Sequence, residues 1–334
     1  LTVTETDGPG FLTLEDCGPR EGDRETSALT FADRDTVAAM AVVPLDDDGR
    51  FCVYRSTAAH SIVDVLGYIG PDGEPLWFEP TVPNRLTDTR TDGACAPLQE
   101  CRTGPVPDQS IHAVPVADER PRIANLAVVN GSEPGVVQAG ACDDIGDDAL
   151  FSNVNYLDEN ARSNLALVGN GDLGSCIYAL TETHVVVDEL GALDPETGYG
   201  WHLDQPRRVL DTRECAAAWC DERPPAGTVI ELDVDIEAPG AALAITVTQP
   251  AAAGFVTVAP CDTFDGSDVT TSNVNHLAGE TVTNLALVDL DKGRTCVYTM
   301  ADAHVVIDVQ AELTADRTNG LTPIEPTRVH DSRT

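Results

Sequence analysis

Short stretches in which apolar and polar residues alternate run through the whole chain. In the stretch 304–310, Val305, Ile307 and Val309 fall on one face of an extended strand. The same period of two recurs at 244–248 and 254–258, and turn-forming residues separate such stretches about every ten residues. No stretch shows an amphipathic helical pattern with caps. The pattern predicts an all-β protein built from β-sandwich modules.

The alternating stretches belong to an internal repeat of about 120 residues. A Cys-Val-Tyr or Cys-Ile-Tyr triplet begins at Cys52, Cys176 and Cys296. Two polar signatures keep the same order, a His-x-x-x-Asp strand and a Pro-x-Arg-x-x-Asp-Thr/Ser-Arg motif. Their polar members are His60 and Asp64; Arg85, Asp88 and Arg90; His184 and Asp188; Arg208, Asp211 and Arg213; His304 and Asp308; and Arg328, Asp331 and Arg333.

The repeat divides the chain into four parts. We expect an incomplete unit at 1–78 that lacks its opening strands, whole units at 79–199 and 200–321, and the opening strand of a further unit at 322–334. A unit of this length is the size of a domain and too long for a solenoid repeat. The sequence therefore predicts tandem disulfide-stapled β-sandwich modules. Trp77 and Trp201 lie just ahead of a new unit, where we expect them to pack the junctions; an exposed sugar-binding platform is the alternative.

The cysteines follow the repeat as well. We expect one long-range disulfide in each unit and two local ones after the Asp-Thr-Arg motifs, namely Cys17–Cys52, Cys142–Cys176, Cys261–Cys296, Cys95–Cys101 and Cys215–Cys220. Zinc is the other use of clustered cysteines, but the Cys-x-x-Cys knuckles typical of zinc sites do not occur. Disulfides predict a secreted protein or one at the cell surface.

The charge balance excludes several classes of partner. The chain has 20 Lys and Arg against 56 Asp and Glu, a net charge of −36. Nucleic-acid binding and attraction to anionic membranes both need clustered positive charge, so we expect neither. No apolar run approaches the roughly 20 residues that span a bilayer, so we expect no membrane insertion. Because the chain starts at Leu1 without Met or a signal-like segment, we expect a piece of a longer precursor.

The repeated polar residues invite a catalytic or metal-binding interpretation, which we weigh against a structural one. His60 and Asp64 lie about 13 Å apart along a strand and cannot pair locally. A module copied with its polar residues keeps what its fold requires, which favours Arg–carboxylate bridges between strands. No nucleophile or phosphate-loop motif occurs, so we predict no catalytic residue, no metal site and no cofactor. Acidic turns at 46–48, 143–148 and 262–265 leave calcium open, although a solvated acidic surface is the simpler interpretation.

The ordered motifs resemble a known kind of module. The string Pro-x-Arg-Leu/Val-x-Asp-Thr-Arg, Gly-Phe-Val-Thr-Val-x-Pro-Cys, Ser-Asn-Val-Asn, Asn-Leu-Ala-Leu-Val, Cys-Val-Tyr and His-Val-Val-x-Asp-Val is similar to tandem modules of large secreted and surface proteins of actinobacteria. The resemblance covers nearly the whole chain and implies extracellular β-rich modules in series, with no defined enzyme activity. The first unit departs from it, because Ser-Ala-Leu-Thr at 27–30 replaces Ser-Asn-Val-Asn.

These features predict a structural extracellular protein, a subunit or segment of a surface filament, fibre or sheath. The spare motif at the end could complete the 1–69 unit of the next copy, giving a head-to-tail homopolymer through Thr327, Arg328, Val329, His330, Asp331, Ser332, Arg333 and Thr334. The competing arrangement has covalent neighbouring repeats. The alternative function is a glycan-binding or adhesion module at the cell surface, and an enzyme ranks last.

Overall fold

The described part of the chain consists of strands and their connections. The computed structural model describes residues 1–18, 26–91, 104–146, 151–157, 161–214, 222–267 and 269–334. Every regular element within these ranges is a strand, and they hold no helix. The all-β class expected from the alternating pattern is therefore confirmed.

The strands fall into three sets that follow the sequence repeat. The first copy has six strands near the start of the chain and one at its end: β1 (Thr2–Thr4), β2 (Gly10–Asp16), β3 (Leu29–Phe31), β4 (Val37–Ala38), β5 (Phe51–Arg55), β6 (His60–Gly70) and β23 (Gly320–Asp331). The second copy has β7 (Trp77–Asp88), β8 (Ser110–Val114), β9 (Arg122–Val129), β10 (Gly135–Ala141), β11 (Val154–Tyr156), β12 (Arg162–Val168), β13 (Ser175–Ala179) and β14 (His184–Asp194). The third copy has β15 (Gly200–Asp211), β16 (Thr228–Asp233), β17 (Gly240–Thr248), β18 (Gly254–Ala259), β19 (Val274–His276), β20 (Val282–Asp289), β21 (Arg294–Thr299) and β22 (His304–Thr314).

Each copy contributes two antiparallel sheets. The inner sheets contain the opening strand and the His-x-x-x-Asp strand, in the orders β23-β6-β1-β4, β12-β9-β14-β7 and β15-β22-β17-β20. The outer sheets contain the Cys-x-Tyr strand, in the orders β3-β2-β5, β11-β10-β13-β8 and β16-β21-β18-β19. Two outer sheets thus have four strands, while that of the first copy has three among the described residues.

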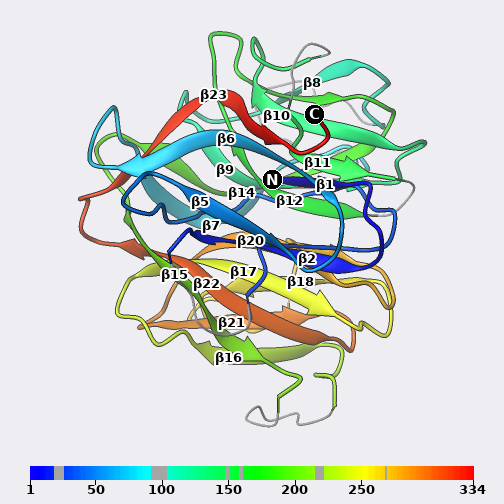
Figure 1. Cartoon of the computed structure of the whole chain (residues 1–334), viewed down its shortest axis with the longest axis vertical. Coiled ribbons are helices and arrows are strands. Elements are labelled where there is room, and N and C mark those ends of the chain that lie inside the picture. Colours follow the sequence, from blue (N-terminus) through cyan, green and yellow to red (C-terminus); the bar gives the residue numbers. More distant parts are fainter. Residues whose placement is uncertain (19–25, 92–103, 147–150, 158–160, 215–221, 268) are drawn as a thin grey trace.

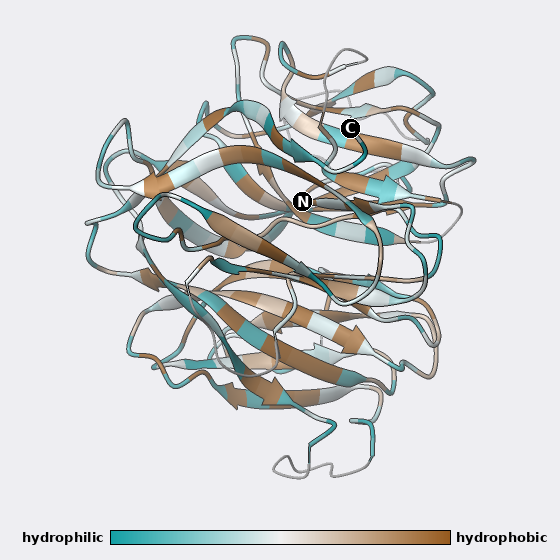
Figure 2. Cartoon of the chain, in the orientation of Figure 1, coloured by the Kyte–Doolittle hydropathy of each residue, from teal (hydrophilic) through white to brown (hydrophobic). Residues whose placement is uncertain are grey.

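Apolar residues fill the space between the two sheets of each copy. Ile177 of β13 and Val297 of β21 are fully buried in the second and third copies, and Leu12 of β2 is fully buried in the first. Figure 2 shows hydrophobic residues concentrated along the strands and hydrophilic residues in many of the connections. The period of two in the sequence therefore reports this packing correctly.

A further hydrophobic cluster joins the copies at the centre of the molecule. It includes Leu193, Leu313 and Leu321, which come from the inner sheets of the second, third and first copies. All nine residues of β17 are buried, so both faces of this inner sheet are covered. The six sheets therefore form one body, arranged as a six-bladed β-propeller. The expected string of tandem β-sandwich modules is wrong, because the inner sheets of the three copies share one hydrophobic cluster at the centre of the molecule.

The last strand closes this body within the chain. β23 pairs antiparallel with β6, placing Thr327 opposite Val65 and His330 opposite Val63. Figure 1 shows β23, at the red end of the chain, running beside the blue β6. The segment expected to be donated to a neighbouring copy, Thr327–Thr334, begins inside β23, which in this structure pairs with β6 of its own chain. The sequence alone could not distinguish pairing within one chain from pairing with a neighbouring copy, because the motif fits the edge of β6 equally well in either case.

No helix in the described residues is long and apolar enough to cross a membrane.

Candidate functional site

The repeated polar signatures meet where the opening strand of a copy pairs with its His-x-x-x-Asp strand. In the third copy, the register of β15 and β22 places Arg208 opposite Asp308. The equivalent pairs are Arg85 with Asp188 between β7 and β14, and Arg328 with Asp64 between β23 and β6. A β-bulge or register irregularity follows Arg208 and Arg328 in their strand pairs. Two motifs far apart in sequence therefore form a single cluster, which we call the arginine–aspartate clamp.

In the third copy the clamp contains two arginines and two aspartates. The Nε and Nη2 atoms of Arg208 donate to the two carboxylate oxygens of Asp308 at 2.9 and 3.2 Å. Its Nη1 reaches Asp211 at 3.4 Å. Arg213 donates from Nε and Nη2 to the two oxygens of Asp211 at 2.8 and 2.5 Å. Both pairs have the two-pronged geometry that makes Arg–carboxylate bonds strong and directional.

The other two copies repeat these contacts. They are Arg85 to Asp188 at 2.6 and 3.0 Å, Arg90 to Asp88 at 2.9 and 2.7 Å, Arg328 to Asp64 at 2.7 and 3.1 Å, and Arg333 to Asp331 at 2.9 and 2.6 Å. The expected bridges between strands are thus present in every copy.

The histidine of each signature lies within hydrogen-bond distance of the Thr or Ser hydroxyl that follows the motif aspartate. Thr212 Oγ1 lies 3.2 Å from His304 Nδ1 and accepts the backbone N–H of Val305 at 2.9 Å. The hydroxyl is therefore placed to donate to a neutral imidazole. Burial and the neighbouring Arg213 lower the pKa of His304, which keeps the ring neutral. Equivalent contacts join Thr89 to His184 at 3.0 Å and Ser332 to His60 at 3.1 Å.

In the second and third copies, the two aspartates of the clamp have opposite pKa shifts. Burial raises the pKa of Asp308, and the hydrogen bonds and charge of Arg208 offset only part of that effect. Burial also acts to raise the pKa of Asp211, but the hydrogen bonds from Arg213 prevail and the pKa is lowered. The same contrast holds between Asp188 and Asp88. Because two guanidinium groups face two carboxylates, the cluster is neutral as a whole and its charges satisfy each other.

Asparagine side chains connect neighbouring copies, a role that sequence reasoning missed. Asn284 Oδ1 of the third copy accepts the backbone N–H of Leu165 in the second at 3.0 Å. Asn164 Oδ1 of the second copy accepts the N–H of Met40 in the first at 2.9 Å. Both asparagines are buried and donate from Nδ2 to a carbonyl of their own copy at 2.6 Å. The recurring Asn-Leu-Ala-Leu-Val string was the available signal.

The third junction uses hydroxyl groups in place of asparagine. Ala39 of the first copy stands where Asn164 and Asn284 stand in the others. There, Thr30 Oγ1 accepts from Thr283 Oγ1 at 3.2 Å. Ser27 N donates to Asp308 at 3.3 Å, which ties this junction to the clamp of the third copy. The departure of the first copy from the Asn-Val-Asn pattern thus coincides with a different way of joining copies.

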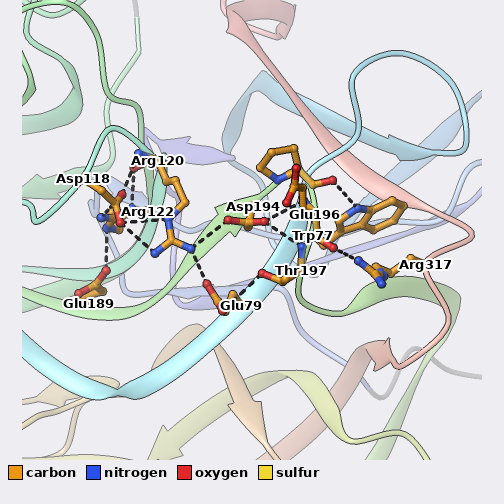
Figure 3. Close-up of polar contacts among 11 residues, drawn as sticks. Trp77, Glu79, Asp118, Arg120, Arg122, Glu189, Asp194, Glu196, Thr197 and Arg317 are labelled. Atoms are coloured by element: carbon orange, nitrogen blue, oxygen red, sulfur yellow. Dashed lines mark hydrogen bonds and ion pairs between the residues drawn. The ribbon is translucent and has the colours of Figure 1, made fainter.

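A second ionic cluster lies at the start of β9 in the second copy (Figure 3). Arg120 bonds Asp118 at 2.9 Å and Asp194 at 3.1 Å, and also contacts Glu79. The Nη2 atom of the buried Arg122 donates to Asp118 at 2.6 Å. Burial acts to raise the pKa of Asp118, but the bonds from these arginines lower it. The cluster joins β7, β9 and β14, and its absence from the repeat signatures explains why sequence did not reveal it.

Of the two tryptophans expected at the junctions, Trp201 is buried there and Trp77 is half-buried. Trp201 is 4% exposed and belongs to the central cluster shared by the copies. Trp77 donates from Nε1 to the carbonyl of Pro195 at 3.2 Å, beside the loop that carries Glu196 and Thr197 (Figure 3). The burial of Trp201 leaves no open ring face there for a sugar.

The three long-range disulfides are confirmed. They join Cys17 to Cys52, Cys142 to Cys176, and Cys261 to Cys296. The other predicted pairs, Cys95–Cys101 and Cys215–Cys220, lie outside the described residues. Three disulfides fit an oxidising, extracellular location.

The acidic turns proposed for calcium bind their own backbone. Asp46 accepts the N–H groups of Asp48 and Arg50 at 3.0 and 2.8 Å, and Asp265 accepts that of Ser267 at 2.9 Å. Within the described ranges, no three acidic, His or Cys residues are grouped to share a metal ion.

The arrangement as a whole can hold strands, sheets and copies together. Comparisons with protein-family models, curated proteins and solved structures give no match to this chain.

Proposed function

We propose that this chain is a non-catalytic structural protein of the cell exterior, a building block of a surface fibre or sheath. The observation that carries the proposal is the use of the repeated polar residues. In all three copies the arginines of the signatures bond the aspartates, and the histidine contacts the hydroxyl that follows the motif aspartate. Side chains that bond one another in this way stabilise the fold, as expected of polar residues that are repeated with it.

Two further features support the proposal. The disulfides suit a protein exposed to an oxidising exterior, and the motif order resembles modules of actinobacterial surface proteins. Closure of the six sheets by β23 changes the expected mode of assembly. With β23 paired to β6 of its own chain, each chain forms one closed body. Copies would then associate through their outer surfaces.

The test is whether the purified protein assembles. With a net charge of −36, copies repel each other at low ionic strength. At physiological salt, screening limits the reach of this repulsion to about 8 Å. We therefore expect ordered fibres or sheets in negative-stain electron microscopy as salt and protein concentration rise. The same sample with its disulfides reduced serves as the control, and we expect it to form no ordered fibres or sheets.

Two results would contradict the proposal. A protein that stays monomeric under all these conditions and binds a defined glycan on an array would be the adhesion-type module that the sequence left as the alternative. Specific turnover of a substrate would make it an enzyme.

A further inference from the structure

A surface hollow opens beside the clamp of the third copy. Its lining comes from the segment just before β16, the turn after β17 and the start of β22, and consists of Glu222, Arg223, Gln249, Asp302 and His304. His304 is 8% exposed, whereas the other four residues are exposed. The hollow therefore has a buried imidazole at its base and polar side chains around its rim.

The contacts of His304 determine which ring nitrogen carries the proton. Thr212 Oγ1 accepts the backbone N–H of Val305, so its own hydrogen is free to donate to His304 Nδ1 at 3.2 Å. A neutral imidazole that accepts at Nδ1 carries its hydrogen on Nε2. Nε2 bonds no described residue, yet it is not among the polar atoms that are sealed from solvent without a partner, so it opens on the hollow. The base of the hollow thus offers an N–H donor.

Arg223 adds a positive charge at the rim. Its Nη1 donates to the carbonyl of Gln249 at 2.7 Å, which holds the guanidinium group beside the hollow and leaves its other nitrogens without a hydrogen bond to the described part of the chain. Burial lowers the pKa of His304, and the charges of Arg213 and Arg223 lower it further, as expected of guanidinium groups near the ring. Because Arg213 already bonds Asp211, Arg223 is the guanidinium that remains for a ligand. Such donors bind a carboxylate well.

Acidic groups lie on the same rim. Asp302 accepts the backbone N–H of Ala226 at 2.7 Å through one oxygen, and Glu222 forms no hydrogen bond or ion pair within the described ranges. Carboxylates of this kind accept hydrogen bonds from an ammonium group. A free anion is disfavoured by the net charge of −36, whereas a ligand that carries one charge of each sign is neutral and meets both halves of the rim.

The second copy has the histidine but not these two charges. The pairing of β8 with β13 and of β16 with β21 makes Ser110 equivalent to Thr228. Counting back, Pro105 stands at the position of Arg223 and Gly104 at that of Glu222. The repeated residues serve the fold, so two charges that are particular to the third copy need another explanation, and a ligand supplies one.

We propose that this hollow binds a small zwitterion of the α-amino acid type. The carboxylate of the ligand accepts hydrogen bonds from Arg223 and from the Nε2–H of His304. Its ammonium group donates to Glu222, with the free oxygen of Asp302 as a second acceptor. This inference does not depend on the proposed function, because binding of a small molecule can be measured on the isolated protein whether or not it assembles.

Glycine and its two halves test the proposal. The whole protein is titrated at neutral pH with glycine, with acetate and with methylammonium, while NMR follows the ring signals of its histidines. We expect glycine to shift the His304 signals saturably, with a dissociation constant on the order of 1 to 10 mM, and each half to bind at least about tenfold more weakly. The ring of His184 is the internal control and should not respond.

Two substitutions separate the halves of the site. Arg223→Gln should weaken glycine binding about tenfold and abolish the effect of acetate, because it removes the charged donor. Glu222→Gln should weaken glycine binding about threefold or more but leave acetate binding unchanged or tighter. Both side chains are exposed, so both variants should keep the fold, which urea unfolding checks. Arg50→Gln is the matched control, because Arg50 is an exposed arginine of the first copy that does not line the hollow.

Three results would overturn the proposal. They are His304 signals that do not move at about 100 mM glycine, acetate that binds as tightly as glycine, or an Arg223→Gln variant that binds glycine like the natural protein. The second result would show a simple anion site without an ammonium half, and the third would show that glycine binds elsewhere.

Discussion

The clamp of the third copy offers the sharpest test of the claim that the polar signatures are structural. Asp308 has a side chain that is 1% exposed, and it accepts two bonds from Arg208 and one from the backbone of Ser27. Asp308→Ala removes the two-pronged bond that holds Arg208, which keeps its 3.4 Å contact to Asp211, and it removes the acceptor of the Ser27 N–H. Breaking one side of a buried ion pair costs about 3–5 kcal/mol, so we expect the free energy of unfolding to fall by about 4 kcal/mol.

The equivalent aspartate of the first copy provides an internal comparison. Asp64 is 11% exposed, and its partner Arg328 is 29% exposed against 20% for Arg208. Solvent reaches this clamp more easily, so Asp64→Ala should lower the free energy of unfolding by only about 2 kcal/mol. Replacing both partners in the third copy, Arg208→Met with Asp308→Leu, should recover much of the loss, because no buried charge is left unpaired.

The assay is urea unfolding at pH 7, followed by the fluorescence of the buried Trp201, with the slope m checked for constancy. The reasoning is refuted if Asp308→Ala costs less than about 1 kcal/mol, or if Asp64→Ala proves the more damaging change.

Three other predictions follow from the described contacts. Burial lowers the pKa of His276 below its usual 6.5, so its contribution to stability is present above that pH and is lost as pH falls; His276→Phe, the residue found at the equivalent Phe31, should remove this loss when urea midpoints are compared at pH 7.5 and pH 5. The double change Cys142→Ser with Cys176→Ser opens a loop of sequence separation 34 and should cost about 4 kcal/mol in the same assay, with a change under about 1 kcal/mol counting against the chain-entropy argument. Asn284→Ala removes the acceptor for the buried N–H of Leu165 and should cost about 1–3 kcal/mol; amide exchange at Leu165 should rise, and an unaltered rate would contradict the proposed link between copies.

The sequence predicted those features that depend on local pattern or on the repeat. Alternation identified strands such as 304–310, and equivalent positions paired Cys142 with Cys176 correctly. The argument that copied polar residues serve the fold also anticipated Arg–carboxylate bridges, although the partner of each arginine was unknown until the register of β15 and β22 was seen.

The packing of the sheets against one another could not be predicted in the same way. The segment 240–248 is apolar on both faces, which shows that it is buried but does not reveal that a second copy covers one face. The role of Asn284 depends on a backbone group in another copy, for which the sequence carries no pairing signal. The pairing of β23 with β6 within one chain could not be predicted either, because a strand motif specifies the edge it fits but not whether that edge belongs to the same chain.

The central claim is that β23 closes a single body by pairing with β6 of its own chain. A cysteine pair at Thr327→Cys and Val65→Cys tests it directly, because these residues face each other in the register and neither is buried. In dilute protein, the account predicts a monomer in which mass spectrometry finds the two new cysteines joined within one chain. Cross-linked dimers, or monomers in which these cysteines stay free under oxidising conditions, would contradict it.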